Sequence, residues 1–221
     1  FRLANEDNRG VYVPAETITK SGVNNWMDGR KSQKIGRVLD MVSDGKVNQF
    51  AIIMDATWRY FRDGQLSVSY TWNDTKDNTT YTGNVANSAT LSQMVIDDPR
   101  DLSHMSYSNN QFRHKIVAYG TAPTFWGITI GARFSGIAGT RYSMISSGNV
   151  NGDFVSTNDL AYVFDPNDSK TPKNIADGIN ALLNNPDVES SFKNYLRRSF
   201  GKVAERNGGV NGFYGTLDLH V

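Results

Sequence analysis

The fold is decided by residues 50–73, which read FAIIMDATWRYFRDGQLSVSYTWN. Two runs within this stretch alternate between apolar and other side chains, and the residues Arg62–Gly64 separate them. A period of two predicts β-strands, because successive side chains leave a pleated strand on opposite faces. Asp-Gly between two alternating runs is a strong hairpin signal. The stretch therefore predicts an antiparallel hairpin with one apolar face, while the other face, apart from Ile53 and Phe61, is small or polar.

The aromatic residues of this hairpin lie near the two ends of its strands. Trp58 and Tyr60 are placed beside the turn, and Tyr70 and Trp72 are placed at the far end of the second strand. Membrane barrels place aromatic girdles at their two interfaces in this way, with an apolar outer surface and a polar lumen. A soluble sheet with one hydrated face also produces the alternation, so a single hairpin does not separate the two classes.

A second hairpin repeats the design. Arg113–Thr121 and Trp126–Ser135 are predicted strands, and Ala122–Thr124 is predicted as the tight turn between them. Trp126 is again an aromatic residue beside the turn.

The connections between these strands are of two very different lengths. Long loops are expected at about 74–106 and 139–212, whereas both hairpin turns are short. Within the second loop, residues 174–199 are typical of a helix that Pro186 splits in two. Short turns at one end and long loops at the other are typical of barrels of the bacterial outer membrane, whereas a β-sandwich more often has short connections at both ends. The sequence therefore favours an all-β fold, an antiparallel transmembrane β-barrel.

The chain divides into two regions. Residues 1–34 are polar and irregular and are expected to form a loop region, and residues 35–221 are expected to form part of a barrel. A short apolar strand is predicted at Ile35–Val42. Both ends of the sequence look cut, so we expect the chain to be a piece of a larger protein.

Composition excludes several classes of protein. The net charge of +1 gives no electrostatic reason to expect nucleic acid as a partner. Hydrophobic residues make up 38% of the 221 residues, and no apolar run is long enough for a transmembrane helix. The absence of cysteine excludes disulfides, thiolate metal sites and cysteine nucleophiles.

Four segments in order resemble one family. They are NNQFRHKIV at 109–117, NVNGDFVSTNDL at 149–160, SFGKVAERNGG at 199–209 and FYGTLD at 213–218. Together they resemble the barrel of TonB-dependent receptors of Bacteroidetes-type bacteria, in particular the Oar-like branch with a carboxypeptidase-like regulatory domain. The resemblance covers most of residues 35–221.

This resemblance implies an outer-membrane active transporter for a large or scarce substrate. Its barrel would have about 22 strands and a lumen plugged by a separate domain, of which this chain would hold five or six strands. The implied partners are outer-membrane lipid, the protein's own plug domain, a TonB-type energising complex and a surface lipoprotein. Asp55, Arg59 and Arg133, which point away from the apolar rows, would face the lumen, where they could pair with the plug. The alternatives are a surface-exposed soluble β-domain such as an adhesin, and a structural barrel without transport.

One loop segment has the oxygen-rich pattern of a calcium site. Asn149, Asn151, Asp153 and Asp159 place oxygen-bearing side chains at the spacing of a cation-binding loop. Phe154 replaces the glycine that an EF-hand requires, and the closing acid is an aspartate one residue early. An Asx-rich turn that bonds its own backbone explains the same residues, so calcium and a plain turn both stay open.

The remaining polar residues do not form a recognisable catalytic set. The three histidines (His104, His114 and His220) share no metal-ligand spacing, and the loop aspartates Asp97 and Asp98 have no positioned partner. No nucleophile elbow, phosphate-binding loop or dinucleotide fingerprint occurs, so we expect no enzymatic activity. A basic run covers the second predicted helix and continues beyond it, and it is expected to be a solvated face or a phosphate contact; it consists of Lys193, Arg197, Arg198, Lys202 and Arg206.

Overall fold

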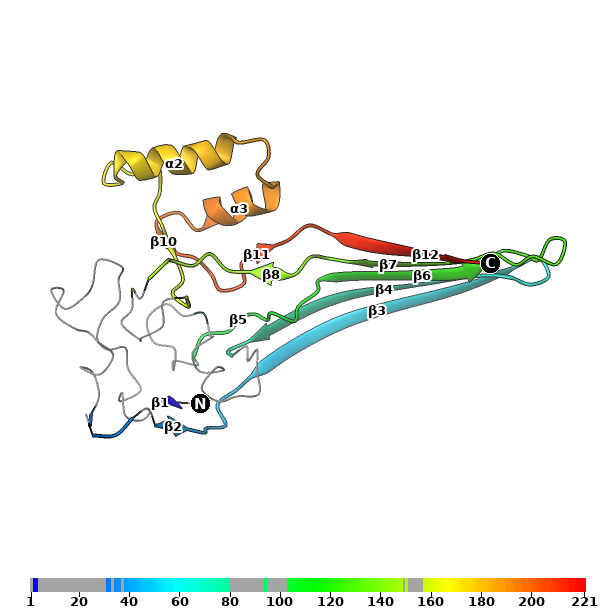
Figure 1. Ribbon diagram of the computed structural model, residues 1–221, viewed down its shortest axis with the longest axis horizontal. Coiled ribbons are helices and arrows are strands. Elements are labelled where there is room, and N and C mark those ends of the chain that lie inside the picture. The colour runs from blue at the N-terminus through cyan, green and yellow to red at the C-terminus, as the bar shows by residue number, and fades with distance from the viewer. Residues whose placement is uncertain are drawn as a thin grey trace.

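The computed structural model describes residues 2–3, 31–32, 34–36, 38–79, 94, 103–148, 150 and 157–221. Over these residues the chain is mostly antiparallel β-sheet, with two helices (Figure 1). Among the described residues, no helix has both the length and the apolarity needed to cross a membrane. The expected all-β class is therefore confirmed at the level of sheet content and strand direction.

The first predicted hairpin forms and is longer than its alternation suggested. The strands Val47–Tyr60 (β3) and Gly64–Asp77 (β4) have 14 residues each and pair antiparallel along their whole length, from Val47 opposite Asp77 to Tyr60 opposite Gly64. Polar residues such as Asn48 and Lys76 extend both strands beyond the apolar rows, because backbone pairing continues where side-chain alternation no longer marks it.

The main sheet of the described residues has six strands. Its order is β12-β7-β6-β4-β3, with the short β5 paired to the end of β4. The further strands are Ser106–Tyr107 (β5), His114–Thr121 (β6), Gly131–Ile137 (β7) and Tyr214–His220 (β12). No described strand pairs with the outer edge of β3 or of β12.

The connection between β6 and β7 differs from the predicted turn at Ala122–Thr124. The strands stop at Thr121 and Gly131, and the chain between them forms a small hairpin with its tip at Trp126 and Gly127. Phe125 and Ile128 exchange two backbone hydrogen bonds of 3.0 and 2.9 Å across this tip. Both tip residues have positive φ, the combination that a type I′ turn requires. The predicted strand at Trp126–Ser135 was therefore wrong in its first residues.

The two short turns lie together at one end of the sheet, and the helices lie at the other end (Figure 1). The turns contact each other directly. The carboxylate of Asp63, between β3 and β4, accepts hydrogen bonds from the backbone N–H and the hydroxyl of Thr124, at 3.1 and 2.6 Å. This arrangement matches the expected asymmetry between short turns and long connections.

The N-terminal part departs from the predicted pattern. The strand expected at Ile35–Val42 is reduced to Leu39–Asp40 (β2), which pairs with Arg2–Leu3 (β1). Val38 and Met41 are exposed, so no apolar face holds a longer strand there. Strand β1 lies within residues 1–34, where we expected a loop.

The second long connection forms a small unit with its own core. It contains Arg141–Tyr142 (β8), Tyr162–Val163 (β9), Lys173–Asn184 (α2), Ser190–Arg198 (α3), Lys202–Val203 (β10) and Gly209–Val210 (β11). Pro186 lies between the two helices, so the predicted split is confirmed. The buried core consists of Val163, Ile179, Tyr195, Leu196 and Ala204.

A buried ion pair joins this helical unit to the main sheet. Arg206 donates to the carboxylate of Asp77 at 2.6 Å and to the carbonyl of the same residue at 2.5 Å. The two side chains are only 7% and 5% exposed, although they are 129 residues apart in sequence. The unit is therefore fixed to the last residue of β4.

Candidate functional site

The strand register gives the main sheet two chemically different faces. Phe50, Ile52, Met54, Ala56 and Trp58 of β3 share a face with Leu66, Val68, Tyr70 and Trp72 of β4. The neighbouring strands continue this face with Ile116, Ala118, Ala132, Phe134, Leu217 and Leu219. From the row of Ile52 and Trp72 to the turns, the five long strands place no Asp, Glu, Lys or Arg on it. We call this surface the apolar face.

The apolar face is open to its surroundings along the described strands. Phe50 is 61% exposed, Trp58 is 65% exposed and Leu219 is 68% exposed. Aromatic rings mark its two ends, where Trp58 packs against Tyr60 at 5.1 Å and Phe50 packs edge-on against Trp72 at 6.0 Å. A soluble sheet normally buries such a surface, because transfer of apolar area from water is favourable.

Glycines let aromatic rings lie flat on the sheet. A side chain at Gly215 would meet the ring of Phe134, and one at Gly64 would meet the ring of Tyr60 at 2.5 Å. The two rings therefore cover the backbone of the neighbouring glycines on the apolar face, and they shield the interstrand backbone hydrogen bonds there.

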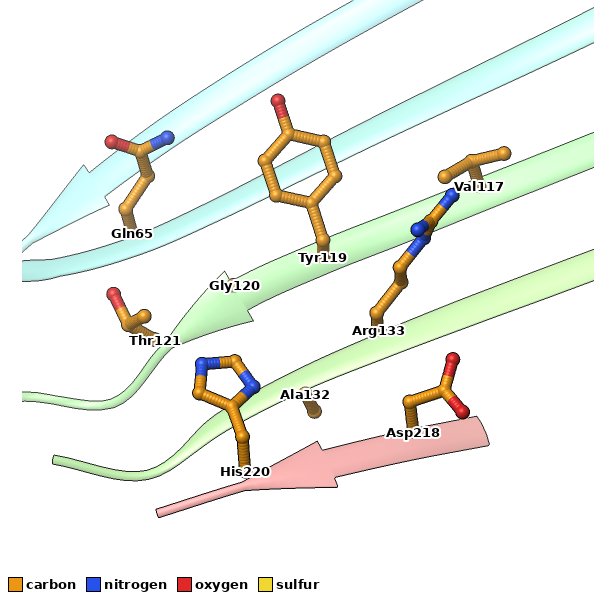
Figure 2. Close-up of a pocket in the computed structure, with 9 residues that line it drawn as sticks. All are labelled: Gln65, Val117, Tyr119, Gly120, Thr121, Ala132, Arg133, Asp218 and His220. Atoms are coloured by element: carbon orange, nitrogen blue, oxygen red, sulfur yellow. The ribbon is translucent and has the colours of Figure 1, made fainter. Parts of the chain in front are cut away.

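The opposite face is polar and contains a hollow near the turn end of the sheet. The hollow has a volume of about 760 Å³. Figure 2 shows the side chains of Tyr119, Arg133 and His220 rising from neighbouring strands around it. Its lining consists of Gln65, Val117, Tyr119, Gly120, Thr121, Ala132, Arg133, Asp218 and His220. This mixture of hydrogen-bonding groups of both charges is suited to contact with water or with a polar protein surface.

The predicted inward-facing residues lie on this polar face. Arg133 is opposite Tyr119 on one side and opposite Asp218 on the other. Asp55 and Arg59 pair with Ser69 and Gln65, away from the apolar rows. The prediction that these three side chains point away from the apolar rows is confirmed.

A second polar region lies at the loop end, where three cations surround the ring of Tyr107. The guanidinium of Arg141 stacks on the ring at 3.8 Å, the ammonium of Lys76 lies at 5.2 Å and the guanidinium of Arg113 lies at 5.5 Å. Arg113 also forms an ion pair of 2.8 Å with Asp74. We call Lys76, Tyr107, Arg113 and Arg141 the Tyr107 cluster. Sequence reasoning missed it, because its members come from four separate strands or loops.

Like charges lie close together in the Tyr107 cluster, and they affect the pKa of Arg141. Burial lowers the pKa of Arg141, and the nearby positive charge of Arg113 lowers it further. The buried side chain of Asn207 donates to the carbonyl of Tyr107 at 2.7 Å, and Arg141 donates to the carbonyl of Asn207 at 3.3 Å. The backbone of Tyr107 and the guanidinium that stacks on its ring are thus both hydrogen-bonded to Asn207 of the helical unit.

The predicted calcium ligands lie mostly outside the described residues. Asn149, Asn151 and Asp153 belong to that part of the chain, so their prediction stays as it was. Asp159 is described and is 1% exposed, and its carboxylate accepts a hydrogen bond of 2.5 Å from the backbone N–H of Val150. Among the described residues, no group of three His, Cys, Asp or Glu side chains is placed to hold a metal ion.

The three histidines belong to different elements of the structure. His104 precedes β5, His220 ends β12 over Gly131, and His114 begins β6. His114 shares a hydrogen bond of 2.7 Å with the hydroxyl of Tyr70 and stacks on its ring. This pair belongs to the loop-end aromatic row of the apolar face.

The basic run is partly used inside the protein. Lys193 donates to the carbonyl of Asn185 at 2.6 Å, and Arg198 donates to the carbonyl of Gly208. Arg206 forms the buried pair with Asp77. A solvated helix face therefore describes only part of this run.

Comparisons with protein-family models, with curated proteins and with solved structures find no match to this chain.

Proposed function

We propose that this chain forms part of the wall of an antiparallel β-barrel in the bacterial outer membrane, belonging to a TonB-dependent active transporter. The observation that carries the membrane proposal is the exposed apolar face with aromatic residues at both ends. In a bilayer, lipid hydrocarbon covers such a surface and no apolar area is left in contact with water. In aqueous solution the same apolar area would be exposed to water, which is unfavourable.

The dimensions of the apolar face support this proposal. Phe50 and Tyr60 are ten residues apart on β3, which corresponds to about 34 Å along the strand. At the strand tilt of about 40° that barrels adopt, this length spans roughly 26 Å along the membrane normal. The apolar band of an outer-membrane barrel is about 25 Å tall, so the lengths agree.

The edges of the sheet also support a larger closed structure. Strand β3 is exposed over nearly its full 14 residues, and no described strand covers its outer edge or that of β12. Long open edges are rare in isolated proteins, because unpaired backbone groups invite pairing with other chains. We propose that further strands of the same protein pair with both edges and close the barrel.

Transport itself is supported by the family resemblance of residues 109–117, 149–160 and 199–209. Under this proposal the polar face lines the lumen and the hollow around Arg133 faces the plug domain. A TonB-type energising complex and a surface lipoprotein are the proposed partners, and a large or scarce compound is the proposed substrate.

Heat-modifiable mobility tests the membrane proposal. The full-length protein that contains this chain should fractionate with the outer membrane, and its electrophoretic mobility should change on boiling, as folded barrels unfold only when heated in detergent. The chain should also need detergent to remain monomeric. A detergent-free, monomeric chain would contradict the barrel and favour a surface-exposed soluble β-domain.

Uptake tests the transport proposal separately. Deleting the energising complex should abolish growth on the substrate that the intact protein supports, while the barrel still assembles. Growth that does not depend on the complex would point to a structural barrel without active transport.

A further inference from the structure

The Tyr107 cluster lies just beyond the loop-end aromatic row of the apolar face. Lys76 is four residues past Trp72 on β4, which is about 14 Å along the strand. Lys76 is also directly opposite Tyr107 in the β4–β5 pairing. By strand alternation Lys76 and Trp72 leave β4 on the same face. A cation therefore follows the apolar face at its loop end.

The cluster carries an excess of positive charge. Lys76, Arg113 and Arg141 contact the ring of Tyr107. Among the described residues, the carboxylate that forms an ion pair with one of these three cations is Asp74, which pairs with Arg113. Three cations against this one carboxylate leave a charge of about two, which matches a phosphate monoester.

The cations are reachable and are held in place before any ligand arrives. Lys76, Arg113 and Arg141 are half-buried, so part of each side chain is open to solvent. Tyr107 is fixed through Asn207, and stacking fixes the plane of the Arg141 guanidinium. A planar, preordered guanidinium loses little freedom when it binds phosphate.

We propose that the Tyr107 cluster binds the phosphate group of a lipid headgroup. The inference rests on the proposed membrane function, because the cluster follows the apolar face at the level where headgroups would lie. The proposed ligand is the anionic phosphate monoester headgroup of a lipid with acyl chains. Arg141 would hold the phosphate through charge-assisted hydrogen bonds, and the ammonium of Lys76 would hold it through its charge.

Matched lipids test the proposal. The detergent-solubilised full-length protein that contains this chain is titrated with phosphatidic acid and with diacylglycerol of the same acyl chains, and bound lipid is measured by native mass spectrometry. Phosphatidic acid should bind about 30-fold more tightly, as two cations near one phosphate would give. The double variant Lys76→Gln/Arg141→Gln should lose this preference. The control Arg59→Gln/Arg133→Gln removes two cations from the polar face and should keep it.

Each outcome has one meaning. Equal binding of the two lipids, or an unchanged preference in the double variant, overturns the proposal. Should Arg141→Gln prevent folding, Lys76→Gln alone should still weaken the preference severalfold, since no hydrogen bond joins the side chain of Lys76 to another described residue. If inorganic phosphate binds as tightly as phosphatidic acid, the cluster recognises a soluble anion and not a lipid headgroup, and the proposal is overturned. Loss of heat-modifiable mobility contradicts the membrane function itself, whereas its persistence without lipid preference contradicts only this inference.

Discussion

At the residue scale, the Asp63 carboxylate shows how a single side chain connects two turns. Hydrogen bonds from the hydroxyl and the backbone N–H of Thr124 lower the pKa of Asp63 below its ordinary value of 3.8. A lowered pKa means that the folded state favours the charged form, so this contribution to stability is present above pH 3.8 and is lost as the pH falls through the lowered pKa.

We expect an NMR titration to place the Asp63 pKa below 3.8 in the folded protein. Thr124→Val removes the hydroxyl donor and should return the pKa part of the way upward. Since Asp63 is fully exposed, the gain in stability should be small and should diminish at high salt. An unchanged pKa in the variant would contradict the contact between the turns.

The Arg206–Asp77 pair predicts a much larger effect, because both side chains are buried. Arg206→Met leaves the Asp77 carboxylate buried beside an apolar side chain, which costs about 3–5 kcal/mol in unfolding free energy. Urea unfolding in detergent measures this cost. The double variant Arg206→Met/Asp77→Leu should recover most of the loss, since a buried pair replaced on both sides is often nearly neutral. No recovery would show that Arg206 acts mainly through its other contacts.

At the element scale, the helical unit depends on the buried side chain of Tyr195 in α3. Its hydroxyl donates to the carbonyl of Glu205 at 2.5 Å and accepts from the backbone N–H of Met144 at 3.3 Å. Burial raises the pKa of this phenol, in opposition to the bond from Met144. The hydroxyl therefore joins α3 to the chain before β9 and to the chain after β10.

Tyr195→Phe should destabilise the helical unit by about 1–2 kcal/mol while the main sheet stays intact. Hydrogen exchange at amides of α2 and α3, compared with those of β4, measures the effect locally. Tyr142→Phe is the matched control, because the Tyr142 hydroxyl makes no hydrogen bond within the described residues and its loss should cost less. Equal destabilisation by both variants would remove the role assigned to the hydrogen bonds.

The elements also show which sequence signals are reliable. Strict alternation predicted β3 and β4 because a half-exposed sheet imposes it on every second residue. Pro186 predicted the end of α2 because proline cannot continue a helix. The turn at Trp126 and Gly127 was missed because tryptophan is uncommon at positive φ, whereas Pro123 is an ordinary turn residue. Ile128 and Ile130 then looked like the start of a strand.

At the scale of the whole molecule, adjacent residues on the two faces of the sheet should respond in opposite ways to an introduced charge. Val68 lies in the middle of the apolar face, and Ser69 lies beside it on the polar face. Under the membrane proposal, Val68→Arg should cost about 2–4 kcal/mol and reduce the heat-modifiable form, because it places a charge in hydrocarbon. Ser69→Arg should leave that form largely unchanged. Equal tolerance of both changes would indicate that water covers both faces.

The candidate site could be predicted only where it depends on local pattern. The two faces follow from alternation within single strands, so Asp55, Arg59 and Arg133 were placed correctly. The Tyr107 cluster and the Arg206–Asp77 pair join residues up to 129 positions apart, and no local pattern records which strands become neighbours. Such contacts depend on sheet order, which alternation does not determine.

The open edge of β3 also determines how the isolated chain should behave in solution. Its 14 residues, nearly all of them exposed, offer a row of backbone donors and acceptors, and the outer edge of β12 offers another. One copy can therefore extend the sheet of the next without limit, because the two edges do not close on each other. We expect the chain, expressed alone and without detergent, to form growing cross-β aggregates that bind amyloid dyes. The same strands that would form a closed wall under the membrane proposal would then act as a template for polymerisation in water.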